Sequence, residues 1–189
     1  MQDKKVIVFV GMPGAGKSVC VEYLKERGIP FAYFGGITID EVKRRGMEVS
    51  EASEKFVRED IRAKEGNGAY AVRIIARVEE YFEEGHDFVV VDGLYSWTEY
   101  KIFKQSFGDN AIIIAIATPR SVRHARLAVR PLRPLSADDA SARDYAEIEN
   151  LEKGGPIANA DHFLANDKDV AELETDLAHL LADLKIKLD

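Results

Sequence analysis

Five short apolar segments are spaced along the chain and are separated by longer stretches of mixed polarity. They lie at residues 6–10, 30–34, 88–91, 111–117 and 162–165. The first, third and fourth are nearly continuous in apolar residues, which is typical of strands that are buried on both faces. Strands that alternate with helical patterns predict an α/β protein with a five-stranded parallel sheet.

Helical patterns fill the intervals between these segments. We expect helices at residues 17–27, in several short pieces over 39–81, and at 170–184. Within the second interval, the helices should break near Gly46 and at residues 66–68. Residues 130–159 contain prolines and glycines, and we predict that they are the most loop-like part of the chain.

Length and composition fit one globular domain over residues 1–189. Hydrophobic residues make up 46% and charged residues 31% of the chain, close to globular averages. No apolar run approaches the roughly 18 residues needed to cross a bilayer, and the first residues lack the pattern of a secretory signal. The single cysteine, Cys20, excludes an internal disulfide. We therefore expect a cytoplasmic protein with no membrane contact, either monomeric or a homodimer.

The charges are distributed unevenly. A formal net charge of −7, from 26 basic and 33 acidic side chains, disfavours binding to nucleic acid or to an anionic membrane. Between Thr118 and Ala137 there is nevertheless no acidic residue, and there are five arginines: Arg120, Arg123, Arg126, Arg130 and Arg133. A basic cluster in an acidic protein favours a small anionic ligand over a long polyanion.

A glycine-rich segment connects the first predicted strand to the first predicted helix. Its sequence, Gly11-Met-Pro-Gly-Ala-Gly-Lys-Ser18, fits the phosphate-loop pattern G-x-x-x-x-G-K-[S/T]. Glycines let the backbone approach an anion, so that N–H groups and the helix N-terminus face the phosphates. Lys17 adds positive charge and the Ser18 hydroxyl is a ligand for Mg²⁺. We expect nucleotide contacts from Gly11, Pro13, Gly14, Ala15, Gly16, Lys17 and Ser18.

A second candidate lies at the end of the third apolar segment. The strand-like run 88–91 is followed by Asp92 and Gly93. In phosphate-loop proteins a carboxylate at this place holds Mg²⁺, directly or through water. The alternative is an ordinary Asp-Gly turn. The phosphate loop at the N-terminus favours the metal-binding role for Asp92.

With these two motifs in place, the chain resembles the P-loop kinases of small molecules: nucleoside monophosphate kinases, dephospho-coenzyme A kinases and, more closely, adenylate-kinase-like proteins of archaea and bacteria. The resemblance covers nearly the whole chain. It implies a three-layer P-loop fold with strand order 2-3-1-4-5 and helices on both faces of the sheet. It also implies an acceptor-side helical region near residues 37–84, a lid near residues 120–145, and an adenine-side loop that contains Asn166.

The part that resembles the phosphate-acceptor site departs from these families. Nucleoside monophosphate kinases have Gly-Asp-x-x-Arg after the second strand, where this chain has Gly35-Gly-Ile-Thr-Ile39. The Asp-x-Asp of dephospho-coenzyme A kinases is missing there too. Leu94-Tyr-Ser96 replaces the Phe-Pro-Arg that usually follows Asp-Gly in nucleoside monophosphate kinases. The sequence therefore does not name the acceptor.

The arginine cluster is the third candidate. A spacing of three residues places Arg120, Arg123 and Arg126 near one helical stripe. Because arginine binds phosphoryl oxygens bidentately, we expect Arg126 and Arg130 to contact nucleotide phosphates and to act in catalysis. The alternative is a solvated basic helix face. Further candidates for anion binding are Arg143 and, on the acceptor side, the pair Arg58 and Arg62, for which surface ion pairs are the alternative.

These observations predict a kinase that uses ATP, or GTP, with Mg²⁺ to phosphorylate a small acceptor such as a nucleoside monophosphate or dephospho-coenzyme A. Lys17, Asp92, Arg126 and Arg130 would carry catalysis, and Ser18 and Asp92 would hold the metal. Two alternatives stay open. One is a regulatory nucleotide-binding protein with slow or no hydrolysis, and the other is a kinase of nucleic acid ends.

Overall fold

The core of the protein is a parallel sheet, seen in a computed structural model that describes residues 4–131 and 133–186. Its strands are β1 (Lys5–Val10), β2 (Phe31–Tyr33), β3 (Phe88–Asp92), β4 (Ala111–Ala117) and β5 (His162–Ala165). All neighbouring strands run parallel, in the order β2-β3-β1-β4-β5. The predicted fold class and strand order are therefore confirmed.

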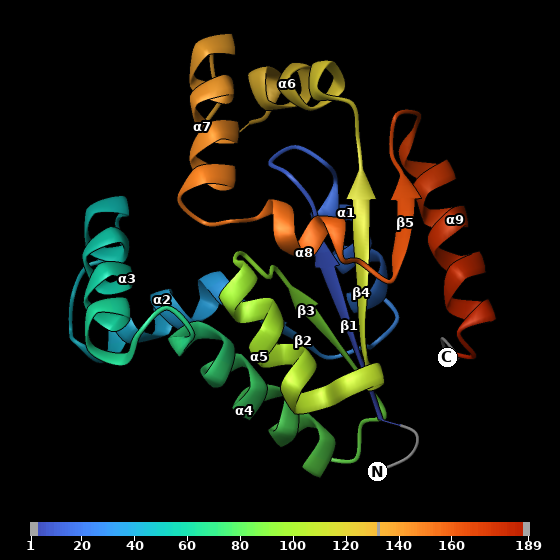
Figure 1. Cartoon of the computed structure of the whole chain (residues 1–189), viewed down its shortest axis with the longest axis horizontal. Helices are drawn as coiled ribbons and strands as arrows, with labels where there is room; N and C mark the ends of the chain where they lie inside the picture. The colour runs from blue at the N-terminus through green and yellow to red at the C-terminus, as the bar shows by residue number, and fades with distance from the viewer. Residues whose placement is uncertain (1–3, 132, 187–189) are drawn as a thin grey trace.

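Helices connect the strands and cover both faces of the sheet (Figure 1). They are α1 (Lys17–Lys25), α2 (Phe34–Arg44), α3 (Glu51–Glu65), α4 (Ala69–Glu83), α5 (Trp97–Phe107), α6 (Arg120–Val129), α7 (Ala137–Glu149), α8 (Gly154–Ala158) and α9 (Val170–Asp183), with a 3₁₀ turn at Gly108–Asn110. The breaks expected near Gly46 and at residues 66–68 are present between α2, α3 and α4. No helix in the described ranges is long and apolar enough to cross a lipid bilayer.

The two faces of the sheet pack against different helices because successive side chains of a strand point in opposite directions. Val6, Val8 and Val10 of β1 join a core with α2, α4 and α5. Ile7 and Phe9 join a second core with α1 and α9. This arrangement makes the expected three layers. It also brings the carboxyl ends of β1, β3 and β4 to one edge of the sheet, where the phosphate loop begins (Figure 1).

Two local predictions need correction. Residues 30–34 form a strand only over Phe31–Tyr33, and Phe34 already begins α2, so the Gly35-Gly36 pair lies in a helix. Residues 130–159, predicted to be largely loop, contain α7 and α8. The face that α7 buries includes Ala140, Asp144 and Glu147, two of which are charged, so no apolar stripe marked this helix.

Candidate phosphate-binding site

The phosphate loop leads from β1 into α1 and leaves the first turn of that helix open. No side chain caps α1, whose N-terminal N–H groups therefore face the space that an anion would fill. Gly16 has a φ of 103°, and a Cβ there would come within 2.1 Å of Asn166 Nδ2. Asn166 in turn donates to the Ala15 carbonyl at 2.7 Å. The predicted adenine-side residue Asn166 thus packs directly on the loop.

Other side chains hold the carbonyl groups of the loop. Lys17 Nζ donates to the Gly11 carbonyl at 2.8 Å, and Arg123 Nη1 donates to the Pro13 carbonyl at 3.0 Å. Thr118 Oγ1 donates to the Ala15 carbonyl at 2.9 Å. Because these side chains already bind the loop carbonyls, the amide groups of the loop remain available to a ligand.

Lys17 and Asp92 form the electrostatic centre of this edge. Burial, and then the positive charge of Lys153, lower the pKa of Lys17 to about 8. Burial raises the pKa of Asp92, although the charges of Lys17 and Lys153 oppose the shift. Asp92 pairs in register with Phe9, two residues before the loop, and Ser18 is exposed at the start of α1. This hydroxyl and carboxylate are the donor types that Mg²⁺ prefers. They fit the predicted metal site, and the structure records no preformed cluster of three metal-binding side chains within its described residues.

Arg126, for which the sequence predicted a nucleotide contact, lies beside Asn166 at the loop. Its Nη2 atom donates to Asn166 Oδ1 at 3.2 Å and to the Lys168 carbonyl at 3.3 Å. Its Nη1 atom is buried and has no hydrogen-bond partner within the described chain. A buried guanidinium nitrogen without a partner is costly, so Arg126 is set to bind an acceptor atom of a ligand beside the loop. Arg130 instead donates to the carbonyl of Arg133 at 2.5 Å.

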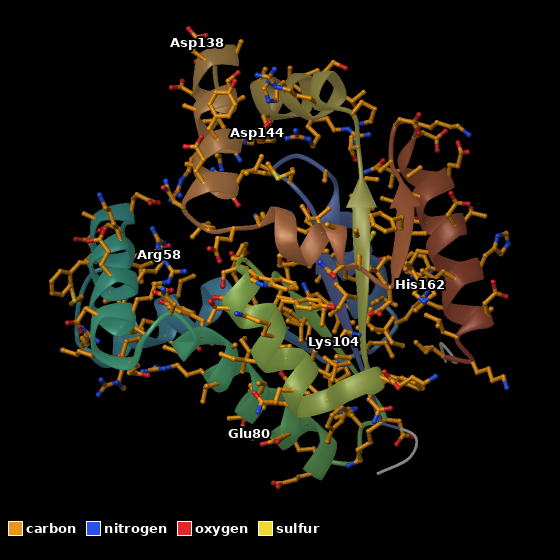
Figure 2. All side chains as sticks on the ribbon, viewed as in Figure 1. Arg58, Glu80, Lys104, Asp138, Asp144 and His162 are labelled. Atoms are coloured by element: carbon orange, nitrogen blue, oxygen red, sulfur yellow. The ribbon has the colours of Figure 1, made fainter. Side chains whose placement is uncertain are left out.

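Arg123, on the same helix as Arg126, has a structural partner. Its guanidinium is only 6% exposed and binds Asp144 of α7 bidentately, with both distances 2.8 Å. His124 adds a contact of 3.0 Å to the same carboxylate. Figure 2 shows Asp144 on the side of α7 that faces α6. The arginine stripe is therefore neither a solvated face nor wholly a phosphate site, since Arg123 joins α6 and α7 to the loop.

We expect Asp144→Asn to destabilise the protein by about 3–5 kcal/mol, because it leaves the buried Arg123 without its counterion. Burial alone would raise the pKa of Asp144, but hydrogen bonds from Arg123 and His124 hold it below its ordinary value. A depressed pKa means that this stabilisation is present above about pH 4 and is lost as the pH falls through the native pKa. Urea unfolding of both proteins at pH 7 and pH 3 measures it. A difference that does not shrink at the lower pH would contradict the assignment.

A cleft of about 390 Å³ adjoins this edge on the side of α2, α3 and α7. Its lining includes Tyr33, Arg58, Arg62, Tyr95, Arg133, Arg143 and Glu147. Arg58 also pairs with Glu51 at 3.2 Å and Glu54 at 3.6 Å, so the surface ion pairs considered for it exist beside the cleft. The charges of Glu147 and Arg143 both act on Lys17, so this end of the cleft lies near the phosphate loop.

The structure adds groups that the sequence did not single out. Lys153 and Glu147 form a buried ion pair, and Tyr95 lies beside them. Nothing local in the sequence signals this cluster, because its members come from three separate elements. Trp97 and Tyr100 stack on each other with ring centroids 4.9 Å apart.

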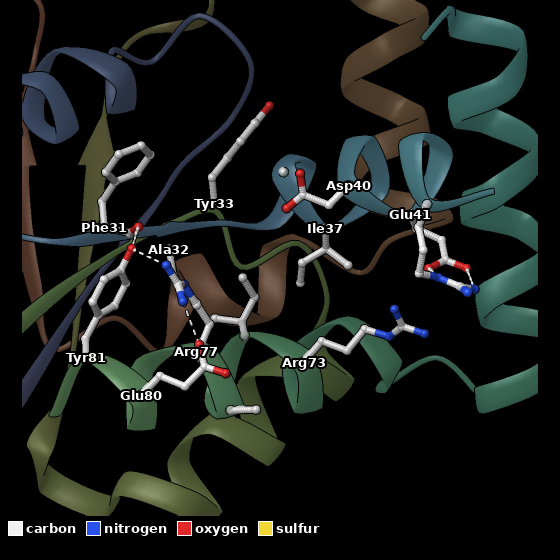
Figure 3. Close-up of a pocket in the computed structure, with 14 residues that line it drawn as sticks. Phe31, Ala32, Tyr33, Ile37, Asp40, Glu41, Arg73, Arg77, Glu80 and Tyr81 are labelled. Atoms are coloured by element: carbon white, nitrogen blue, oxygen red, sulfur yellow. Dashed lines mark hydrogen bonds and ion pairs between the residues drawn. The ribbon is translucent and has the colours of Figure 1, made fainter. Parts of the chain in front are cut away.

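A second cavity, of about 560 Å³, lies between β2, α2 and α4 (Figure 3). Tyr81 and Arg77 partly close it against the sheet edge, and Arg77 pairs with Glu80 at 2.6 Å. Phosphate-loop residues are absent from the lining of both cavities, but the cleft includes Arg143 and Glu147, whose charges act on Lys17, and the second cavity does not. We therefore place the candidate site at the loop and its adjoining cleft.

The fold and the loop together define a P-loop protein with a five-stranded parallel sheet. A sequence profile described as "AAA domain" matches residues 7–152. The UPF0200 protein of Thermococcus onnurineus is 32% identical over 93% of this chain and 96% of its own length. The UPF0200/UPF0201 protein of Archaeoglobus fulgidus is 36% identical over 84% of this chain, which spans about half (48%) of that relative. The chain belongs to the AAA domain family and to the UPF0200 proteins.

Solved structures share the fold across almost the whole chain. TT1252 from Thermus thermophilus has a TM-score of 0.67 at 20% identity and covers 96% of this chain and 98% of its own. A shikimate kinase from Acinetobacter baumannii has a TM-score of 0.57 at 18% identity, with 97% and 96% covered. A gluconokinase from Sinorhizobium meliloti has a TM-score of 0.58 at 17% identity, with 97% of each chain covered. At these identities the similarity concerns the fold.

Proposed function

We propose that this protein is a cytoplasmic kinase that transfers the γ-phosphoryl group of ATP, with Mg²⁺, to a small molecule bound in the cleft beside the loop. The observation that carries the proposal is the shared edge. An uncapped helix N-terminus, Lys17 and Asp92 share one edge of the sheet, and the neighbouring cleft of arginines and tyrosines includes Arg143 and Glu147, whose charges act on Lys17. Such a cleft suits an anionic acceptor, and its position beside the loop suits direct transfer.

The residues have separate roles in this mechanism. Loop amides and Lys17 bind the β- and γ-phosphates, while Arg126 offers its free nitrogen from the adenine side. Ser18 and Asp92 would hold the Mg²⁺, which supplies charge neutralisation on the phosphate oxygens. Phosphoryl transfer needs little covalent chemistry from the protein, so alignment and charge do most of the work.

Product analysis tests the proposal. Protein and ATP are incubated with a panel of nucleoside monophosphates, dephospho-coenzyme A, and small hydroxylated carboxylates and sugars. A kinase yields ADP and a phosphorylated acceptor in equal amounts. ADP with inorganic phosphate alone, or no turnover with any of them, would instead support the nucleotide-binding regulatory protein.

Asp92→Asn tests the metal site. We expect it to weaken binding of Mg²⁺–nucleotide by about tenfold, because an amide cannot supply the lost negative charge to the metal. Binding of the nucleotide without Mg²⁺ should change much less. Calorimetry with and without EDTA measures both, and Asp40→Asn, an exposed carboxylate in the second cavity, is the matched control. Equal losses in the two conditions would show that Asp92 is only a turn residue.

A further inference from the structure

Lys153 is a buried ammonium group that none of the roles above uses. The residue is 2% exposed, and its Nζ atom donates to the carboxylate of Glu147. The same atom lies 4.8 Å from the centroid of the Tyr95 ring, in a cation–π contact. An ammonium group has three hydrogen atoms to donate. Glu147 accepts one and the Tyr95 ring faces another, so at least one remains for a ligand.

The position of Lys153 is fixed from two sides. It is the residue before α8, and its backbone N–H donates to the Glu147 carbonyl at 3.1 Å. Gly155, on the first turn of α8, packs against Trp97 so closely that a Cβ would come within 2.8 Å of the indole ring. The ammonium is therefore held in place by packing as well as by its ion pair.

Contacts lead from Lys153 to the reacting end of the loop. The Tyr95 ring beneath its Nζ atom packs on Gly93, where a Cβ would come within 2.6 Å of the ring. Gly93 directly follows Asp92. The positive charge of Lys153 acts on both Lys17 and Asp92, and among neighbouring charges it has the largest effect on Lys17. Two ammonium groups and one carboxylate therefore lie near one another at this end of the loop.

The positive charges of the buried Lys153 and the partly buried Lys17 repel each other, and a purely structural ion pair between Lys153 and Glu147 does not require this proximity. An anion between them would remove the repulsion and bind strongly in these dehydrated surroundings. The space also lies next to Glu147, which lines the adjoining cleft. A group at this place is therefore reached both from the nucleotide and from the acceptor.

We propose that Lys153 is a second phosphoryl-binding lysine, whose ammonium group binds the phosphoryl group in transit on the side opposite Lys17. The inference rests on the proposed kinase function. In the transfer, the bond from the γ-phosphorus to the bridging oxygen breaks and its electron pair leaves with ADP, while an acceptor oxygen forms the new bond to phosphorus and, where it is a hydroxyl oxygen, releases its proton to water. Lys153 gives up no proton. It neutralises charge on the non-bridging oxygens, and Glu147 holds it ready until the substrates arrive.

The test compares binding of a non-hydrolysable ATP analogue with binding of ADP, each with Mg²⁺, by calorimetry. We expect Lys153→Met to weaken the ATP analogue at least tenfold and ADP by less than threefold, because only the analogue carries the γ-phosphoryl group. Lys153→Arg should restore most of the difference. Lys104→Met is the matched control, since Lys104 also forms an ion pair, with Asp161 at 2.9 Å, but lies away from the loop. It should change neither affinity.

The outcomes separate this inference from the kinase proposal. Equal effects on the two nucleotides, or no effect beyond that of Lys104→Met, would overturn the role of Lys153 even if the wild-type protein phosphorylates an acceptor. A selective loss would support Lys153 as a γ-phosphate ligand even if no acceptor is found. Should Lys153→Met not fold, Glu147→Gln gives the answer. Removing the competing carboxylate should raise the preference for the ATP analogue several-fold, and an unchanged preference would contradict the proposal.

Discussion

Replacing Lys17 with methionine is expected to lower nucleotide-dependent turnover by about 10³-fold or more while the protein stays folded. The loss is large because the Lys17 ammonium lies against the loop, on the Gly11 carbonyl, and charge stabilisation of the transferring group is the main source of rate in this chemistry. The free energy of unfolding should change by less than about 1 kcal/mol, since Lys17 is a partly buried cation that forms no ion pair with a described residue.

Steady-state turnover and urea unfolding of the same preparation measure the two quantities. Lys25→Met serves as the matched control, because Lys25 ends the same helix and pairs only with the exposed Glu22 at 2.8 Å. It should keep wild-type turnover. Unchanged turnover in a folded Lys17→Met protein would contradict the phosphate-loop assignment itself.

Replacing Arg126 with alanine is expected to lower kcat by about 10²-fold, with a smaller effect on nucleotide affinity. The buried Nη1 atom of Arg126 lacks a partner within the described residues, and its guanidinium lies next to Asn166 at the loop. An ordered donor of this kind contributes most when charge develops on the phosphoryl oxygens. The alanine variant also lacks the buried, unpaired nitrogen. Its free energy of unfolding should therefore fall less than the loss of kcat alone would suggest.

Single-turnover and steady-state kinetics separate the effect on kcat from that on KM. Arg77→Ala is the control, because Arg77 bonds to Glu80 and Tyr81 at the second cavity, far along the chain from the loop. Arg130→Ala forms a useful comparison. Arg130 is bonded to its own turn in this structure, so a comparable loss of kcat there would indicate that this turn rearranges when substrates bind. If both variants keep the wild-type kcat, the arginine cluster has no catalytic part.

The sheet and the loop could be predicted because their signals are local. Each buried strand is a short apolar run, and the loop motif is contiguous between β1 and α1. Asp92 and Asn166 could also be proposed as site residues. Asp92 ends β3 and Asn166 follows β5, and the carboxyl ends of these strands meet at one edge of the sheet. Residues 130–159 were predicted wrongly for a physical reason. Helix α7 has a capping serine, Ser136, but its buried side includes Asp144 and Glu147 instead of an apolar stripe.

What could not be predicted depends on pairs of residues that are far apart in the chain. The burial of Asp144 is explained by its ion pair with Arg123, and the two residues meet because α7 packs on α6. The burial of Lys153 could not be predicted either. A lysine in a glycine-containing segment is expected to be exposed, and only the packing of α8 on Trp97 buries it. Sequence spacing therefore predicted the nucleotide end of the candidate site, whereas the residues that face the cleft are brought together only by tertiary packing.

The double role of Arg123 constrains how the predicted lid can move. Its guanidinium holds Asp144 of α7 and the Pro13 carbonyl of the loop at the same time, so swinging α6 and α7 outward together would first have to expose a buried charge. Excursions of low energy are then confined to the turn between the two helices. Amide protons of α6 should exchange with solvent slowly even without nucleotide, as should that of Leu135, which donates to the Leu127 carbonyl at 3.0 Å, whereas those of Arg133 and Ser136 should exchange rapidly. Substrate exchange would thus depend on movement of this turn while α6 and α7 stay in place. Turnover limited by that movement would slow as solvent viscosity rises.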